Sequence, residues 1–599
     1  MPTLAAGSNT QVSLAAGVAL YVSGSGTLQV APPNPGPLVQ IQQAGTSVGP
    51  FLVPVTVNLS AATTVTYRTD DNSNPMDVSA VLGPDSATPI GLNLGGVTYP
   101  IPKQTTGNNV AILGNSICAQ VYPTWASTDA GWLTANSYSL SAFASPSVYD
   151  LTGGYIPLRY QVTTAGVSGA TEPIWPTVAG GTVTDGTVVW TAVANSATPF
   201  WQQSWWHIAQ SLSGQRLNEV FIAGRSGKQS ADILLYVDRA LASGADIIYF
   251  ATMFENDCWP GAAPSLATVT ASWTAVAAAM DRCRNLGKRV MTQTVLPNGN
   301  IDASSLFTGY SRGNGTKAWQ WLNAQIRDFV RSRPDVIFFD AASVYVDTNP
   351  ANPVWPENTL TYLSQSGSGQ ALKKTDGVHP QGAAGYALGA ALAPVLSANF
   401  AAVSHFGTAL DENARSKNPL NGGTGGTAGT NMSGTIAASM GTNAYGTATG
   451  VGSLVARTDI AGNWQQIVYS ATVADNVDYN TLTAFPLNNF AVGDLAQGFA
   501  ELKVLANPTL LKQIYLRMDY SGGSPSQSLS GTDIGNNAQD VGQFMTTDTT
   551  WTVKTVPMKI PTGTTGFVLF CRQYGRGAAS YTSQFGRQSV MRLPNPALA

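Results

Sequence analysis

The chain has 599 residues, of which 44% are hydrophobic and only 11% are charged. Its length exceeds that of one ordinary domain core, while its 61 glycines and 35 prolines fall short of a disordered composition, so several folded domains are expected. The net charge of −3, with no basic stripe, argues against a nucleic-acid partner.

Residues 1–100 are predicted to form a β-rich domain. Short apolar or alternating runs, such as residues 51–59, are separated by Pro, Gly, Ser and Asn, which is typical of strands joined by turns. The first 67 residues carry no charged side chain, because Arg68 is the first one in the chain. Its first residues lack the basic and apolar regions of a secretory signal.

Residues 101–405 show strands alternating with helices. The strand-like runs are uncharged and rich in Val, Ile and Phe, so both faces of each strand are expected to be covered. This predicts a central α/β/α sandwich built on a parallel sheet. The apolar run 382–403 is interpreted as a packed helix and not a membrane span. The expected strands are 110–114, 218–224, 246–252, 289–295 and 335–340, and the expected helices include 228–244, 265–286 and 316–331.

A small β module, residues 146–198, is predicted to interrupt this domain. It lacks a helical period, and Asp185-Gly186 between two β-like runs indicates a hairpin turn. The module resembles short aromatic-bearing modules of phage tail proteins, which look like carbohydrate-binding modules. Tyr160, Trp175 and Trp190 could stack on sugar rings, or they could fill the core of so small a unit.

The last part of the chain is predicted to be a linker followed by a β-sandwich. Residues 406–430 are rich in Gly and Thr, a linker composition. Residues 431–599 contain several short alternating runs, which predict a jelly-roll-like β-sandwich and a candidate carbohydrate-binding domain.

Three residues could form a catalytic triad. His379 follows Asp376 by three residues, so one loop could hold the carboxylate against the imidazole. Ser116 stands at the end of the first predicted strand of the α/β domain, at the sheet edge where open α/β sheets bind ligands. Each residue also has a plain structural alternative, since serines at strand ends are common in turns.

Two further loops could supply donors for an oxyanion. Gly224 ends the second strand, Gly227 follows it, and Asn256 follows the third strand. Backbone or side-chain N–H groups held at such positions could bind developing negative charge. The alternatives are helix-entry geometry for the glycines and a loop cap for the asparagine.

The order of these four blocks resembles the SGNH (GDSL-type) hydrolase family, over about 101–145 and 199–400. The resemblance implies that Ser116 is the nucleophile, His379 the base and Asp376 the orienting carboxylate. It also implies an oxyanion hole made by Gly227, Asn256 and the backbone N–H of Ser116.

Two positions depart from the family pattern. Asn115 replaces the usual Asp before the serine, at a position expected to support the loop. Phe254 replaces a glycine and is expected to narrow the site.

The remaining reactive residues have structural interpretations. Cys118 and Cys258 are expected to be small buried residues near the site, and His207 a packed histidine. Glu255 and Asp257, which flank Asn256, could contact a substrate, but they are expected to be solvated at the surface. The sparse Cys and His residues suggest neither disulfides nor a metal centre, and the hydrolase chemistry needs no cofactor.

Together these features suggest a serine esterase that removes O-acetyl groups from a bacterial surface polysaccharide. The flanking β-rich regions resemble a phage tail spike or fibre, which implies a place in the virion, other tail proteins as partners, and action on the host surface. Trimers are common in such proteins, although no heptad repeat supports one here. The alternatives are a non-catalytic receptor-binding adhesin and a secreted bacterial carbohydrate esterase.

Overall fold

The computed structural model divides the chain into two units, Met1–Lys103 and Gln104–Ala599. The structure describes residues 3–14, 19–23, 26–30, 39–41, 46–48, 55–61, 65–70, 78–82, 89–94, 97–100, 108–124, 130–156, 158–194, 200–201, 204–258, 264–296, 318–345, 380, 382–406, 414–416, 418–473, 476–481, 485–487, 490–507, 511–522, 528–530, 547–575 and 579–593.

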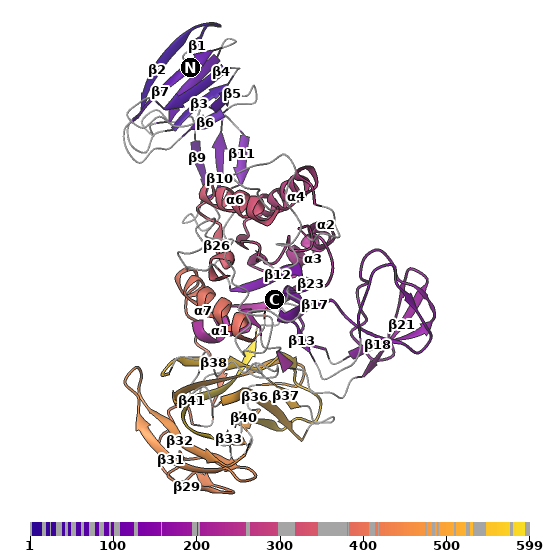
Figure 1. Ribbon diagram of the computed structural model, residues 1–599, viewed down its shortest axis with the longest axis vertical. Coiled ribbons are helices and arrows are strands. Elements are labelled where there is room, and N and C mark those ends of the chain that lie inside the picture. Colours follow the sequence, from indigo (N-terminus) through magenta and orange to yellow (C-terminus); the bar gives the residue numbers. More distant parts are fainter. Residues whose placement is uncertain are drawn as a thin grey trace, which may run out of the picture. The chain divides into compact units, whose positions relative to one another are not determined.

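The first unit is built from antiparallel strands in its described part (Figure 1). The sheet orders are β1-β8-β3-β6, β2-β7-β4-β5 and β11-β10-β9. This agrees with the β-rich texture expected from the sequence. The strands are β1 Thr3–Leu4, β2 Asn9–Leu14, β3 Ala19–Ser23, β4 Gly26–Val30, β5 Val39–Ile41, β6 Thr46–Val48, β7 Val55–Ala61, β8 Val65–Asp70, β9 Val78–Leu82, β10 Pro89–Leu94 and β11 Val97–Pro100.

The second unit contains the predicted parallel sheet, with strand order β17-β23-β12-β24-β25-β26. All neighbouring pairs are parallel except β17 with β23. Leaving out the short edge strand β17, the order in chain sequence is 2-1-3-4-5, which is a doubly wound topology. The strands are β12 Asn109–Asn115, β17 Val148–Asp150, β23 Asn218–Arg225, β24 Ile247–Phe250, β25 Arg289–Gln293 and β26 Ile337–Phe339.

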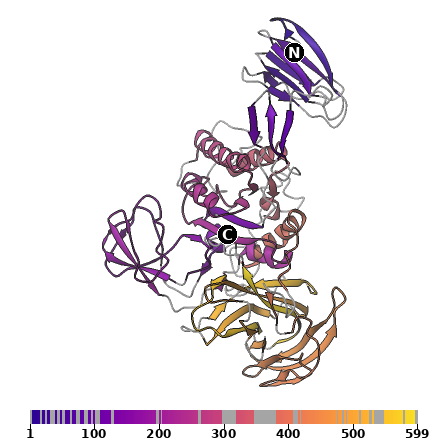
Figure 2. The same cartoon turned by 180° about the vertical axis from the view of Figure 1, so that it is seen from behind.

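Helices cover both faces of this sheet, as Figures 1 and 2 show from opposite sides. On β12, Ala111 and Leu113 pack with residues of α2, α3, α4 and α6, whereas Val110 and Ile112 pack with residues of α1 and α7. Both faces of the strand are therefore buried, which explains its uncharged sequence. The helices are α1 Trp205–Ser213, α2 Ser230–Leu234, α3 Val237–Ala242, α4 Leu266–Asn285, α6 Ala318–Arg331 and α7 Gly382–Asn399.

The helix predicted over 228–244 is two short helices, α2 and α3, and this is a correction. They are separated at Leu235 and Tyr236, whose backbone does not continue the first helix. The predicted helices 265–286 and 316–331 correspond to α4 and α6, and the apolar run from residue 382 forms α7. No helix in the described part of the chain is both long and apolar enough to span a membrane.

The inserted module is a separate sheet of order β14-β16-β18-β21-β20. The hairpin expected at Asp185-Gly186 is present, because Asp185 pairs with Val188. The module starts before the predicted residue 146, and β17, which lies inside the predicted range, belongs to the main sheet. The strands are β14 Ala130–Gly131, β15 Ser137–Tyr138, β16 Phe143–Ser145, β18 Leu158–Thr164, β19 Gly166–Val167, β20 Thr182–Asp185 and β21 Val188–Ala194.

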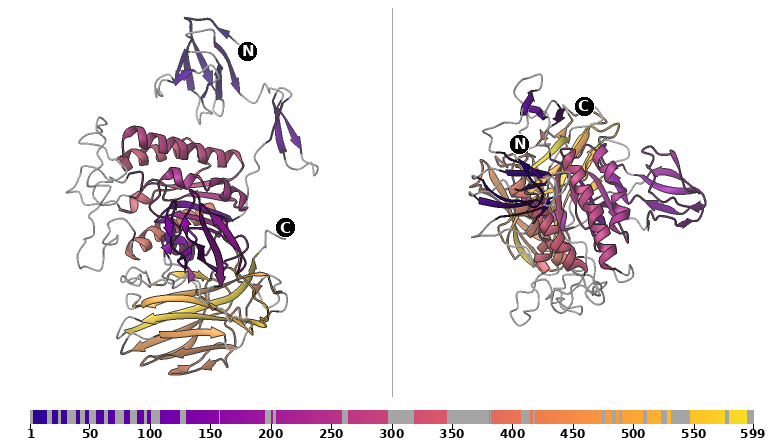
Figure 3. Two further views of the ribbon diagram at one scale, coloured as in Figure 1. Left: turned by 90° about the vertical axis from the view of Figure 1, so that its right-hand side faces the viewer. Right: turned by 90° about the horizontal axis from the view of Figure 1, so that it is seen from above.

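The C-terminal region is a β-sandwich, whose two stacked sheets are visible in Figure 3. One sheet has the order β13-β22-β37-β36-β40-β33-β30-β28 and the other β29-β31-β32-β41-β35-β38. Its strands are β13 Pro123–Thr124, β22 Phe200–Trp201, β27 Ala414–Arg415, β28 Thr427–Ala428, β29 Met432–Gly434, β30 Met440–Ala444, β31 Thr449–Ala456, β32 Asn463–Ala471, β33 Asn476–Thr481, β34 Phe485–Pro486, β35 Leu495–Ala506, β36 Leu511–Ser521, β37 Ser528–Ser530, β38 Thr550–Lys554, β39 Met558–Lys559, β40 Gly566–Gly575 and β41 Ala579–Leu593.

Two observations show that this sandwich is joined closely to the α/β region. Strands β13 and β22, which lie on either side of the inserted module in the sequence, belong to its first sheet. The apolar core around α1 and α7 also continues into the sandwich core without a break. The segment 406–430, predicted to be a linker, contributes β27 and β28 to the sandwich. This is a correction, and its reason is that backbone pairing with β41 and β30 holds these two short stretches as strands.

The predicted fold class is thus confirmed. The chain is multidomain, with a parallel-sheet α/β region and a β-sandwich.

Candidate active site

The candidate site lies at the carboxyl ends of β23, β12 and β24. After β12 the chain first adds β23 on one side of it and then β24 on the other, so the strand order reverses at β12. Doubly wound sheets bind ligands beyond the carboxyl ends of the strands at such a point. Ser116 follows the last residue of β12 directly, Gly227 lies two residues beyond β23, and Asn256 lies in the turn after β24. The topology therefore places three of the predicted site residues at one edge.

The turn that carries Ser116 is held by its neighbour Asn115. The Asn115 side chain is buried, and its Oδ1 accepts a hydrogen bond from the backbone N–H of Ile117 at 2.9 Å. The Asn115 backbone N–H donates to the carbonyl of Thr252 at 2.8 Å. Ser116 itself is half-buried. Asn115 thus supports the loop, as expected for this departure from the family pattern.

The two candidate glycines have different roles. The backbone N–H of Gly224 already donates to the hydroxyl of Tyr122, and a Cβ at Gly224 would lie 2.5 Å from the backbone nitrogen of Ala119. Gly224 therefore permits a close approach of two backbones. Gly227 has a φ of +70°, in the region that favours glycine, and lies in the exposed turn after β23. Because the N–H of Gly224 is already bound to Tyr122, Gly227 remains the predicted oxyanion donor of the two glycines.

Asn256 connects the turn after β24 to the turn of Gly227. Its Nδ2 donates to the carbonyl oxygen of Lys228 at 2.7 Å. An asparagine amide carries two N–H hydrogens, so this bond orients the group while leaving its second hydrogen to reach a ligand. The backbone N–H of Lys228 in turn donates to the carbonyl of Arg225 at 3.1 Å, which closes the turn around Gly227.

The other two predicted triad residues, Asp376 and His379, lie outside the described residues, so their roles remain predictions. The helix expected shortly after them is α7, which begins at Gly382.

Glu255 and Asp257, which flank Asn256, are buried, contrary to the expectation that they are solvated. Only 2% of the Glu255 surface is exposed. Its Oε2 accepts from Nδ2 of Asn115 at 2.7 Å, and its Oε1 accepts from the backbone N–H of Leu296 at 3.2 Å. Glu255 therefore ties together the loops after β12, β24 and β25 directly beneath the Ser116 turn.

Asp257 has a related structural role. Its carboxylate accepts from the backbone N–H and the hydroxyl of Ser230, both at 2.8 Å, and from the hydroxyl of Ser272 at 2.6 Å. Asp257 thus holds the first turn of α2 against α4. The sequence could not reveal these two buried carboxylates, because their partners are distant along the chain.

Glu255 is expected to make stability fall between about pH 4.5 and 7. Burial raises the pKa of this carboxyl to about 7, although hydrogen bonds from Leu296 and Asn115 oppose the rise. In that window the folded chain holds a proton that the unfolded chain, with an ordinary value of 4.5, has lost. The ionised form is therefore disfavoured by folding, by about 3 kcal/mol above pH 7 at about 1.4 kcal/mol per pH unit.

The measurement is the urea midpoint of wild type and Glu255→Gln between pH 4.5 and 8. The urea midpoint of wild type should fall as the pH rises over this range, and that of the variant should fall much less. Asp238→Asn removes a carboxylate whose side chain is 74% exposed, and it should keep the wild-type profile. Identical dependence of the urea midpoint on pH in Glu255→Gln and wild type would contradict a raised pKa at Glu255.

The aromatic residues proposed to stack on sugars lie in the core of the inserted module. The exposed fractions of Tyr160, Trp175 and Trp190 are 5%, 8% and 0%. The rings of Tyr160 and Trp175 stack with centroids 4.2 Å apart, and Trp190 meets Trp175 edge-on. The structure thus favours the core-filling alternative over sugar binding, because a module this small needs its large rings inside.

The other reactive side chains are also placed in the interior. His207 is fully buried, its Nε2 lies 3.1 Å from the carbonyl oxygen of Val121, and burial lowers its pKa to about 4. Cys118 and Cys258 are buried free thiols whose pKa is raised by burial. All three fit the structural interpretation. The described residues contain no group of three or more His, Cys, Asp or Glu side chains suited to a metal ion.

The sequence matches no protein-family model and none of the curated proteins. Parts of the structure are similar to solved structures. A G-D-S-L family lipolytic protein from Desulfitobacterium hafniense DCB-2 aligns with 32% of this chain and 89% of its own, at 13% identity and a TM-score of 0.24. A GDSL-like lipase from Bacteroides thetaiotaomicron aligns with 29% of this chain and 74% of its own, at 17% identity and a TM-score of 0.22. A family 11 carbohydrate-binding module from Clostridium thermocellum, in complex with a mixed-linked tetrasaccharide, aligns with 26% of this chain and 89% of its own, at 12% identity and a TM-score of 0.17.

Proposed function

We propose that the chain is a serine esterase that removes O-acetyl groups from a bacterial surface polysaccharide. The observation that carries the proposal is the convergence of Ser116, Gly227 and Asn256 at the carboxyl ends of adjacent strands, with the two donor turns joined by the bond from Asn256 to Lys228. A nucleophile beside preset N–H donors is the arrangement that acyl transfer requires.

The reaction proceeds in two steps. Ser116 attacks the acyl carbonyl while His379, oriented by Asp376, accepts the hydroxyl proton. The backbone N–H groups of Ser116 and Gly227 and the side chain of Asn256 bind the oxyanion, and the proton passes to the departing sugar hydroxyl. Water, activated by His379, then releases acetate from Ser116.

The C-terminal sandwich offers a surface suited to a polysaccharide on the outward side of β40. Residues of β40 alternate between the core and this side, where Phe570, Arg572 and Tyr574 are half-buried and Tyr445 is exposed. The Arg572 guanidinium lies 5.4 Å from the ring centre of Tyr445 and 5.9 Å from that of Tyr574. Asp478 binds both Arg572, at 2.6 Å to Nη2, and the Tyr445 hydroxyl, at 3.0 Å. Fixed aromatic rings beside polar groups can stack on and hydrogen-bond to sugars.

The virion context is part of the same proposal. It is supported by the β-rich first 100 residues, of which the first 67 carry no charge, and by the resemblance of the flanking regions to phage tail spikes or fibres. In that setting the enzyme deacetylates the host polysaccharide during adsorption, next to other tail proteins.

Acetate release from a small acetyl ester and from acetylated host polysaccharide tests the enzymatic part, with Ser116→Ala as the inactive comparison. Release from both substrates by wild type alone supports the proposal. Release from the small ester alone contradicts the polysaccharide assignment. A wild type that binds host cells but releases no acetate is the outcome expected of an adhesin.

Sugar binding by the sandwich is tested separately in a Ser116→Ala background. Tyr574→Ala is expected to weaken polysaccharide binding about 5- to 10-fold in affinity electrophoresis, because it removes one stacking ring. Val468→Ala, which changes an exposed residue of the opposite sheet, should bind as the parent does. Equal binding by all three proteins would place the sugar site elsewhere.

A further inference from the structure

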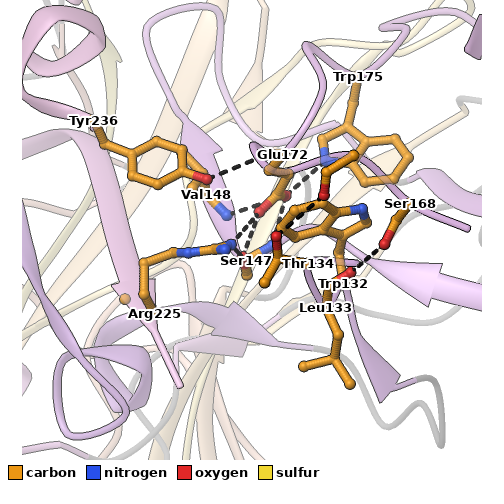
Figure 4. Close-up of polar contacts among 12 residues, drawn as sticks. Trp132, Leu133, Thr134, Ser147, Val148, Ser168, Glu172, Trp175, Arg225 and Tyr236 are labelled. Carbon is orange, nitrogen blue, oxygen red and sulfur yellow. Dashed lines mark hydrogen bonds and ion pairs between the residues drawn. The ribbon is translucent and has the colours of Figure 1, made fainter. Parts of the chain in front are cut away.

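A buried carboxylate of the inserted module, Glu172, lies at the junction with the α/β region (Figure 4). It is located between β19 and β20 and accepts five hydrogen bonds. The donors are the backbone N–H of Ser147 at 2.8 Å, that of Val148 at 3.3 Å, Nε1 of Trp175 at 2.7 Å, Nη1 of Arg225 at 3.0 Å, and the Ser147 hydroxyl.

The partner of Glu172 in the α/β region is Arg225, the last residue of β23. The side chains of this ion pair are 0% and 4% exposed, so each charge depends on the other for compensation. The guanidinium lies 4.9 Å from the ring centre of Trp132 in the module and 5.1 Å from that of Tyr236. Tyr236 also accepts the backbone N–H of Glu172 at 3.2 Å. The module is therefore locked to the end of β23.

Arg225 leads directly to the candidate oxyanion donors. Its carbonyl accepts the N–H of Lys228 and so closes the turn that contains Gly227, and the carbonyl of Lys228 accepts the side chain of Asn256. A shift of Arg225 would therefore reach the turn of Gly227 through the first of these hydrogen bonds and Asn256 through both.

A second branch of contacts reaches the nucleophile loop. The hydroxyl of Ser147 is hydrogen-bonded to both Glu172 and Arg225. The backbone carbonyl of Ser147 accepts a hydrogen bond from the hydroxyl of Tyr122. Tyr122 follows the short 3-10 helix Cys118–Val121, which begins two residues after Ser116. The same carboxylate therefore supports loops on both sides of the site.

We propose that Glu172 is a positioning residue, through which the inserted module holds the oxyanion turn in its catalytic geometry. The inference rests on the proposed esterase function and makes the module a structural part of the active site. Residues that orient a metal ligand from behind typically contribute about 10- to 100-fold to metal affinity or activity, and we expect an effect of similar size from a residue that orients an oxyanion donor.

The test is Glu172→Gln, which keeps the shape of the side chain and removes its charge. With p-nitrophenyl acetate, kcat per active site is expected to fall at least about tenfold while KM changes less than twofold, because donor geometry matters most in the transition state. Active sites are counted by stoichiometric labelling of Ser116 with a fluorophosphonate. A purely structural role would lower the number of labelled sites and leave kcat per site unchanged.

Asp185→Asn is the matched control within the module. Asp185 is also buried and accepts from the indoles of Trp132 and Trp190, at 2.7 and 3.1 Å, but Arg225 is not among its hydrogen-bond donors. Its kcat per labelled site should remain within twofold of wild type.

If Glu172→Gln does not fold, Trp175→Phe removes one hydrogen bond to Glu172 and keeps an aromatic ring. Its kcat per site should fall about two- to fivefold, since part of the same network is lost. Wild-type kcat per site in the folded variant overturns the inference. A wild type that neither labels nor hydrolyses the ester overturns the esterase proposal itself, so the two failures are distinguishable.

Discussion

Replacing Ser116 by alanine is expected to lower kcat for hydrolysis of a small acetyl ester by about 10⁴-fold or more. Ser116 directly follows the last residue of β12 and is the predicted nucleophile, and no acyl-enzyme can form without its hydroxyl. Loss of the nucleophile of a triad typically costs this much, while the oxyanion donors retain a small residual rate. The measurement is initial-rate kinetics together with fluorophosphonate labelling, which should be absent from the variant.

Cys118→Ala is the control for this prediction. The Cys118 thiol lies two residues from Ser116, but it is buried and its pKa is raised, so it is protonated and a poor nucleophile. The variant should retain activity within a few-fold of wild type and label normally. Activity that survives Ser116→Ala and disappears with Cys118→Ala would move the nucleophile to the thiol.

The central fold was predictable because its signals are local. A strand such as β12 is buried on both faces, and its apolar, uncharged sequence shows this directly. The positions of Ser116, Gly227 and Asn256 at strand ends followed from the same alternation, since the carboxyl ends of parallel strands meet at one edge.

Features that depend on distant partners were not predictable. Asn115 and Glu255 are 140 positions apart, and nothing near Glu255 in the sequence indicates that its carboxylate is buried. The range 406–430 has the composition of a linker, but strand partners elsewhere make parts of it β structure. Composition indicates the local conformational preference of a segment. It does not show which of its backbone groups pair with strands elsewhere in the chain.

The partner of Lys554 is also distant in the sequence and could not be predicted from it. Loss of this lysine is expected to have the largest effect on stability. It lies at the end of β38 in the sandwich, and its Nζ is 2.5 Å from Oε2 of Glu219 in β23. Both side chains are only 2% exposed. Burial alone would raise the pKa of Glu219, but Lys554, His207 and hydrogen bonds from Lys554 and Gln210 outweigh it and lower the pKa to about 2. The carboxylate is therefore ionised and needs its partner.

Lys554→Met is expected to lower the free energy of unfolding by about 3–5 kcal/mol, because it leaves Glu219 charged and buried without its counter-ion. Urea unfolding measures this. Lys503→Met makes the same change in the same domain, at an ion pair with Asp548 whose carboxylate side chain is 72% exposed, and should cost less than about 1 kcal/mol. The double variant Lys554→Met/Glu219→Gln should recover most of the loss, because no charge is then stranded. Equal losses for the two lysine variants would mean that the sandwich does not close over Glu219, and that its contact with β23 contributes little to holding the two regions together.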